Sequence, residues 1–197
     1  TPIGISGSNY GGTFDGNHHT ISGLYVNAPG MSYVGFFGYI IGGGTIKNLT
    51  IADSYFKGNN YVGGVCGDTS GAVSGCSYSG AVTGTSSVGG VCGQSQGTVS
   101  GCTNRGKVTG NNKFGGICGY AYHGTVSGCI NYGAVNGSGY VGGICGYALY
   151  CEVSGCINYG AVNGTSSYVG GVCGVNSNTV SGCTNTGAVT GSSTSYY

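Results

Sequence analysis

Short apolar runs recur along most of the chain and are separated by clusters of glycine, serine and asparagine. Each copy of the pattern holds three runs, of which YVGGVCG, GTVSGC and GAVTG are typical. Valine and isoleucine favour strands, whereas clusters of Gly, Asn and Ser mark turns. The pattern therefore predicts a repeating unit of three short β-strands joined by three turns.

Five copies align with a period of 26 to 28 residues over 61–197, and two looser copies occupy 12–60. A unit of this size cannot bury its apolar side chains alone, so successive units are expected to stack. We predict one all-β domain over 1–197, a right-handed parallel β-helix of about seven coils with three short strands per coil. The handedness follows from the rule that crossovers between parallel strands are right-handed.

Stacking would bring equivalent residues of successive coils into columns along the axis. One apolar column starts with Leu24 and Leu49 and continues through Cys76, Cys102, Cys129, Cys156 and Cys183. A second column holds Cys66, Cys92, Cys118, Cys145 and Cys173. Because leucine can take the place of cysteine, we expect small buried side chains with free thiols, which is a common role of cysteine. Disulfides between coils, or metal ligation, are the alternatives.

Three further sets of residues stand out in the repeats. A column of asparagines, preceded by Tyr78 in the first regular copy, predicts a hydrogen-bonded ladder from coil to coil; it contains Asn104, Asn131, Asn158 and Asn185. Cys151 replaces a turn glycine and is the candidate for an exposed, reactive thiol. Stacked tyrosines suggest a contact face for a sugar or a partner protein; the candidates are Tyr120, Tyr132, Tyr147 and Tyr159. Mutual stacking that only stabilises the coils is the alternative reading of these tyrosines.

The composition narrows the classes of function. Of 197 residues, 47 are glycine, and only five Lys or Arg and four Asp or Glu are charged. Five scattered cations cannot form the basic surface that binds nucleic acid. No apolar run reaches the length of a transmembrane helix. We therefore expect neither nucleic-acid binding nor a membrane span.

Residues for catalysis or metal binding are sparse. Polysaccharide-cleaving β-helix enzymes need carboxylates clustered on one face, yet Asp15, Asp53, Asp68 and Glu152 fall at different positions of the repeat. The three histidines are expected in surface loops, without the further ligands that a metal requires. We expect no enzyme activity, no metal and no cofactor.

The segment GTFDGNHHTISGLYVN, followed by YVGFFGYIIGGGTIKNLTI and then by repeats of VGGVCG, GTVSGC and GAVTG, resembles the GLUG-repeat family. The resemblance covers about 12–191. It implies a bacterial secreted or cell-surface protein, because such repeats occur in adhesin-like proteins and in the non-catalytic part of some IgA-cleaving proteases. It transfers no catalytic residues.

These observations predict a structural repeat module, such as an adhesin stalk or spacer that contacts other surface proteins or glycans. The first alternative is an extracellular filament subunit that stacks head to tail on copies of itself, since low charge weakens the electrostatic barrier to association. The second is a carbohydrate-binding module that uses the tyrosines. The chain is expected to be a mature protein or a fragment of a longer one.

Overall fold

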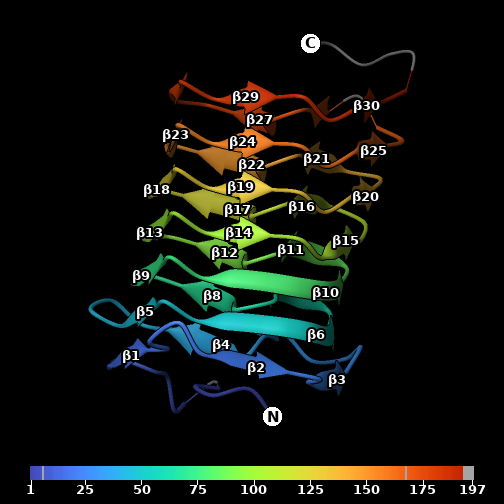
Figure 1. Ribbon diagram of the computed structural model, residues 1–197. Helices are drawn as coiled ribbons and strands as arrows, with labels where there is room; N and C mark the ends of the chain where they lie inside the picture. The colour runs from blue at the N-terminus through green and yellow to red at the C-terminus, as the bar shows by residue number, and fades with distance from the viewer. Residues whose placement is uncertain (6, 167, 193–197) are drawn as a thin grey trace.

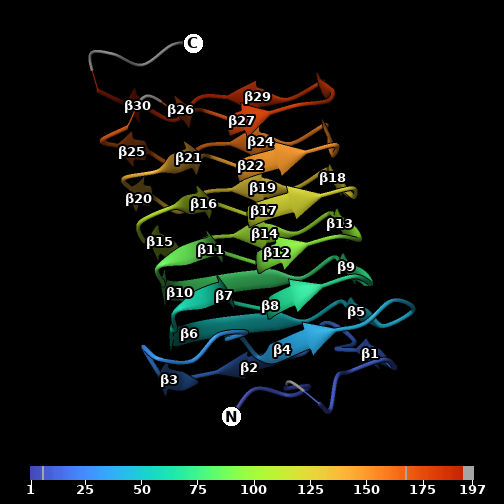
Figure 2. The same ribbon diagram turned by 180° about the vertical axis from the view of Figure 1, so that it is seen from behind.

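The computed structural model describes residues 1–5, 7–166 and 168–192, so the last residues of the fifth repeat lie outside the description. The described chain winds into a stack of parallel strands (Figures 1 and 2). In Figure 1 it runs from left to right on the near side, returns on the far side and rises towards the C-terminus, which makes the coil right-handed. The predicted right-handed parallel β-solenoid is therefore confirmed. None of the described residues forms a helix that could span a membrane.

In the described residues, thirty short strands form four sheets along the solenoid, and every pairing between them is parallel. The seven-stranded sheet contains β1 (Thr13–Asp15), β5 (Thr45–Lys47), β9 (Ala72–Ser74), β13 (Thr98–Ser100), β18 (Thr125–Ser127), β23 (Glu152–Ser154) and β28 (Val180–Ser181). The six-stranded sheet contains β4 (Phe37–Ile40), β8 (Cys66–Thr69), β12 (Cys92–Ser95), β17 (Cys118–Tyr122), β22 (Cys145–Leu149) and β27 (Cys173–Asn176). The five-stranded sheet contains β7 (Asn60–Gly63), β11 (Ser86–Gly89), β16 (Lys113–Gly115), β21 (Tyr140–Gly142) and β26 (Val169–Gly170).

The twelve-stranded sheet collects two strands from most coils. It contains β2 (Thr20–Ser22), β3 (Tyr25–Asn27), β6 (Thr50–Lys57), β10 (Ser77–Thr83), β14 (Thr103–Asn104), β15 (Lys107–Thr109), β19 (Ile130–Asn131), β20 (Val135–Gly137), β24 (Ile157–Asn158), β25 (Val162–Gly164), β29 (Thr184–Asn185) and β30 (Val189–Thr190). A typical coil thus has five strands, such as β11 to β15, rather than the three predicted. A bend at the G-G pair divides the first predicted run into two strands, and a further short strand, such as β14, lies between the second and third runs.

The chain makes about six turns rather than seven, because the first coil contributes named strands to only two of the four sheets. Its register also differs from the sequence alignment. Aligning Leu24 with Leu49 would also place Ile21 beside Ile46, but Phe14 pairs with Ile46, and Ile21 pairs with Ile51 of β6. Leu24 bonds through its backbone N–H to the Ser54 hydroxyl and lies outside the cysteine column. Both Thr13–Asp15 (T-F-D) and Thr20–Ser22 (T-I-S) fit the repeat pattern. The first coil places the earlier segment beside β5 in the seven-stranded sheet.

Val65 and Cys66 are adjacent in sequence, yet both side chains point into the core and are fully buried. Their two backbone N–H groups donate to the same carbonyl, that of Val91, at 3.0 and 3.1 Å. This is the pattern of a β-bulge, which breaks the alternation of side chains. The bulge recurs one coil later at each equivalent pair: Val91 and Cys92, Ile117 and Cys118, and Ile144 and Cys145.

Candidate functional site

The predicted asparagine column is a continuous ladder of hydrogen bonds inside the twelve-stranded sheet. The side-chain Nδ2 of Asn104, of Asn131 and of Asn158 each donates to the Oδ1 of the next asparagine at 2.8 Å, ending at Asn185. Each of the three also closes its own turn, because Nδ2 and Oδ1 bond the backbone C=O and N–H of the residue two positions on. The three amides are fully buried, and each is satisfied by partners that the repeat itself supplies.

Tyr78 occupies this column in the first regular coil, in register with Asn104. Its ring is buried, and its hydroxyl donates to the backbone carbonyl of Ser54 at 2.7 Å. Burial raises the pKa of the phenol far above its ordinary value. Tyr78 therefore closes the lower end of the ladder with one hydrogen bond in place of several.

The second glycine of each G-G pair faces this column across the narrow interior. A methyl group on Gly116 would overlap the side-chain amide carbon of Asn131. The same holds for Gly90 against Asn104 and for Gly143 against Asn158. Glycine is thus required at this position because the amide of the opposite strand fills the space that a Cβ would take.

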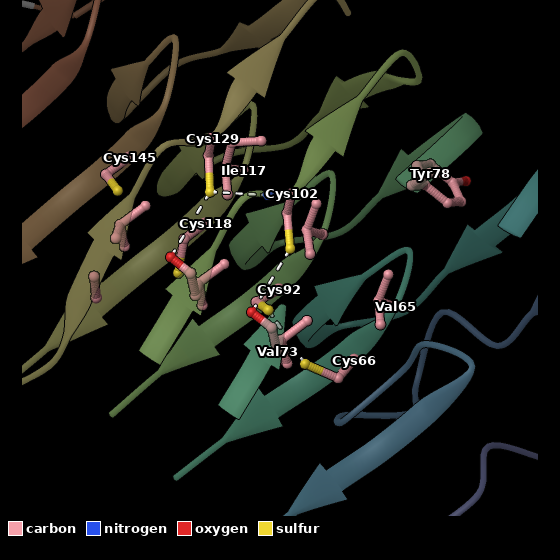
Figure 3. Packing of buried hydrophobic residues seen from close by; sticks show 14 of the residues in the cluster. Val65, Cys66, Val73, Tyr78, Cys92, Cys102, Ile117, Cys118, Cys129 and Cys145 are labelled. Atoms are coloured by element: carbon pink, nitrogen blue, oxygen red, sulfur yellow. Dashed lines mark hydrogen bonds between the residues drawn. The ribbon is translucent and has the colours of Figure 1, made fainter. Parts of the chain in front are cut away.

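Both predicted cysteine columns run along the core, part of which is drawn in Figure 3, and their last members, Cys173 and Cys183, are half-buried. None of the eleven cysteines forms a disulfide. In the column that holds Cys66, the Sγ of Cys66 lies 3.3 Å from that of Cys92. In the column that holds Cys76, the Cys102 thiol lies 3.4 Å from the carbonyl of Ser100 and 3.7 Å from that of Val73. The backbone N–H of Cys102 donates to the Sγ of Cys129 at 3.4 Å. These cysteines fill space and also serve as weak partners for backbone groups at a corner of the coil.

Cys151 was expected to be exposed, and this expectation is wrong. The side chain is fully buried. Removal from water, which is the largest cause, and the neighbouring Cys173 raise the pKa of its thiol to about 11. Tyr150, just before it, has a positive φ of 52° and is itself exposed. The turn thus presents the tyrosine to solvent and directs the following cysteine into the core.

The four candidate tyrosines lie on two sides of the solenoid rather than on one face. Tyr120 and Tyr147 are paired on β17 and β22 of the six-stranded sheet. Tyr132 and Tyr159 directly follow β19 and β24 of the twelve-stranded sheet. The first two strands are in front in Figure 2 and the second two in Figure 1. A single contact surface therefore cannot include all four.

Each tyrosine pair carries a cation. The rings of Tyr132 and Tyr159 stack with centroids 5.0 Å apart and planes 9° apart, and the guanidinium of Arg105 lies 4.7 Å above Tyr132. The Lys113 ammonium lies 4.1 Å from the centroid of the Tyr120 ring. Partial burial lowers the pKa of this ammonium. Stacking from coil to coil accounts for these contacts without a ligand.

A hollow that sequence reasoning missed lies where the six- and five-stranded sheets meet near the N-terminal end. Its volume is about 360 Å³, and Tyr33, Tyr39, Tyr61, Asp68, Gln94 and Gln96 line it. Asp68 is only 5 % exposed; its Oδ2 accepts a bond from Gln94 Nε2 at 3.2 Å, and its Oδ1 is buried without a partner. Burial raises the pKa of this carboxyl from its ordinary 3.8 to about 6, against the opposing effects of the Thr69 backbone N–H and of the bond from Gln94.

The other carboxylates do not join this hollow. Asp15 accepts a bond from Asn48 and pairs with Lys47 at 3.3 Å near the surface of β1 and β5. Asp53 and Glu152 are exposed on β6 and β23. Within the described part of the chain, no group of three or more His, Cys, Asp or Glu residues is arranged to hold a metal ion.

No protein-family model matches the chain. A stretch of 73 residues is 42 % identical to halomucin of Haloquadratum walsbyi, which covers 37 % of this chain and 1 % of halomucin. A stretch of 72 residues is 31 % identical to a provisionally named Gly-rich membrane protein of Evansella cellulosilytica, which covers 30 % of this chain and 8 % of that protein. The chain therefore spans a small part of either relative.

The fold is similar to the crystal structure of a provisionally named immunoglobulin A1 protease from Bacteroides ovatus. The TM-score is 0.79 with 20 % sequence identity, over 90 % of this chain and 61 % of the other. At this identity the similarity shows a shared β-solenoid fold.

Proposed function

We propose that the chain is a rigid, non-catalytic repeat module of a secreted or cell-surface protein, related to the GLUG repeats and acting as a stalk or spacer. The observation that carries this proposal is the asparagine ladder. Its side chains bond only to each other and to their own turns. Such a network holds each coil at a fixed height above the one before, as a spacer requires.

The matched proteins support the location. Their names describe a mucin-like protein and a Gly-rich membrane protein, and the similar structure is named as an immunoglobulin A1 protease. The module is a small part of both sequence relatives, which suits a segment that sets distance within a larger protein.

Removal of one coil tests the spacer role. Thr103 pairs in register with Ile130, so deletion of residues 103–129 joins Cys102 to Ile130 and keeps every column. We expect a folded protein, by circular dichroism and cooperative unfolding, that is shorter by one strand spacing, about 4.8 Å, in small-angle X-ray scattering. Deletion of 103–116, which breaks the register, is the matched control and should not fold. Collapse of the in-register variant would refute the proposal.

Self-association is a second candidate, supported by the small number of charged residues that would oppose the approach of copies. Analytical ultracentrifugation and electron microscopy over a range of protein concentrations test it. A mass that stays monomeric at high concentration would exclude head-to-tail filaments.

A further inference from the structure

We propose that the hollow at Asp68 is a binding site for one or two units of an uncharged saccharide. This goes beyond the spacer role and does not depend on it. The hollow has the volume of a small-molecule site, and its lining combines aromatic rings, amides and one carboxylate.

The site interrupts a strip of tyrosines. Along the six-stranded sheet, Asp68 is in register with Tyr39 on one side and with Gln94 on the other. Gln94 is in turn followed by Tyr120 and then Tyr147. Two smaller polar side chains thus replace the rings that continue the strip, and the space that those rings would fill is open.

Asp68 supplies the strongest reason to expect a ligand. A buried carboxylate oxygen without a donor is unfavourable, and Oδ1 is such an atom. The hydrogen bond from Gln94 holds the other oxygen in place. A hydroxyl group of a bound ligand would donate to Oδ1 in a charge-assisted bond, which is stronger than a neutral one.

The tyrosines provide a platform beside this carboxylate. Tyr33 and Tyr61 stack with centroids 4.9 Å apart and planes 26° apart, and both have positive φ values of 61° and 57°, which are rare for bulky residues. The hydroxyl of Tyr39 is held 3.2 Å from that of Ser70. Tyrosine offers an apolar face with a polar tip, which suits the C–H faces and hydroxyl rim of a sugar ring.

The lining favours a saccharide over a cation. Side-chain amides both donate and accept hydrogen bonds, as sugar hydroxyls do, whereas an ammonium ion only donates. The lining holds the amides of Asn9, Gln94 and Gln96. The nearly parallel rings of Tyr33 and Tyr61 also do not surround a central point, as the walls of an aromatic cage do. Since the lining residues include a carboxylate and no Lys or Arg, an acidic sugar should be repelled.

The test measures binding of a panel of neutral mono- and disaccharides, with glucuronic acid and tetramethylammonium as charged probes. Isothermal titration and chemical-shift changes of backbone amides at β8 and β12 report binding at up to about 50 mM, above the millimolar Kd expected of a small site. We expect at least one neutral saccharide to bind and both charged probes to fail. Binding of tetramethylammonium in place of sugars, or no saccharide binding, overturns the proposal.

Variants locate the site. Asp68→Asn keeps the shape and removes the charge, and Tyr61→Ala removes the platform; each should weaken binding about tenfold or more. Glu152→Gln and Tyr132→Ala change an acid and a tyrosine away from the hollow and should leave binding unchanged. Circular dichroism confirms that each variant is folded. Binding that survives both hollow variants, or that Tyr132→Ala abolishes, refutes this assignment.

Discussion

Replacement of Asp68 by asparagine should change how stability depends on pH. The pKa of this carboxyl is raised by burial from 3.8 to about 6 in the folded protein. Between these values the folded protein holds a proton that the unfolded chain has released, so the free energy of unfolding falls as pH rises. The contribution is fully present below pH 3.8 and lost above pH 6. Two pH units at about 1.36 kcal/mol each amount to about 3 kcal/mol.

Asp68→Asn cannot titrate, and its side chain still accepts the bond from Gln94. We therefore expect the free energy of unfolding of the wild type, relative to the variant, to fall by about 2.4 kcal/mol between pH 4 and pH 7, because part of the effect is already lost at pH 4. Urea unfolding followed by circular dichroism at several pH values, in buffers free of sugars and glycerol, measures this difference. Asp53→Asn, at an exposed position on β6, is the matched control and should run parallel to the wild type. Parallel curves for Asp68→Asn, or a difference of opposite sign, would refute the buried-charge reasoning.

Four other changes probe the coil interior and surface. Asn131→Ala removes two rungs of the ladder and leaves buried partners unsatisfied, so urea unfolding should show a loss of about 3 kcal/mol or more; a loss below 1 kcal/mol would argue against the ladder. Gly116→Ala should cost about 1–3 kcal/mol by overpacking, whereas Gly30→Ala, in open space, should be neutral; equal effects would disprove the fit. Cys151 should resist iodoacetamide at pH 8 until the protein unfolds, because the thiolate is the reactive form; mass mapping of a rapidly labelled native Cys151 would contradict its burial. Tyr132→Ala should cost no more than about 1 kcal/mol, because its contacts are exposed; a larger loss would give the stack a structural role.

The repeat made most of the architecture predictable. Residues with the same offset, such as Val73 and Val99, must lie one above the other once the coils stack, and the asparagine ladder follows from the same fact. The prediction failed where the pattern allowed two solutions. Thr13–Asp15 and Thr20–Ser22 both suit the position beside β5 in the first coil. Only the three-dimensional packing places Phe14, from the first of these segments, beside Ile46.

Local rules failed where the backbone departs from regular geometry. Alternation places Val65 and Cys66 on opposite faces of a strand, but the bulge directs both inwards. Cys151 replaces a turn glycine and was therefore expected at the surface. The positive φ of Tyr150, just before it, instead directs the Cys151 side chain into the core. The sequence gives no reason to separate Asp68 from the other scattered acids, because its surroundings come from neighbours in other coils, such as Tyr39 and Gln94.

The forces between coils have a consequence for the surroundings in which the solenoid can work. Neighbouring coils are joined mostly by amide, thiol and backbone groups that carry no net charge. Charged contacts between coils are few in the described residues; they include the exposed ion pair of Lys47 with Asp15, the bond from Gln94 to Asp68, and the cations of Arg105 and Lys113 over tyrosine rings. Dissolved salt screens charges but leaves hydrogen bonds between buried neutral groups almost untouched. A change in ionic strength should therefore alter the stability of the coil stack very little, and the stack should stay intact from dilute fresh water to concentrated brine.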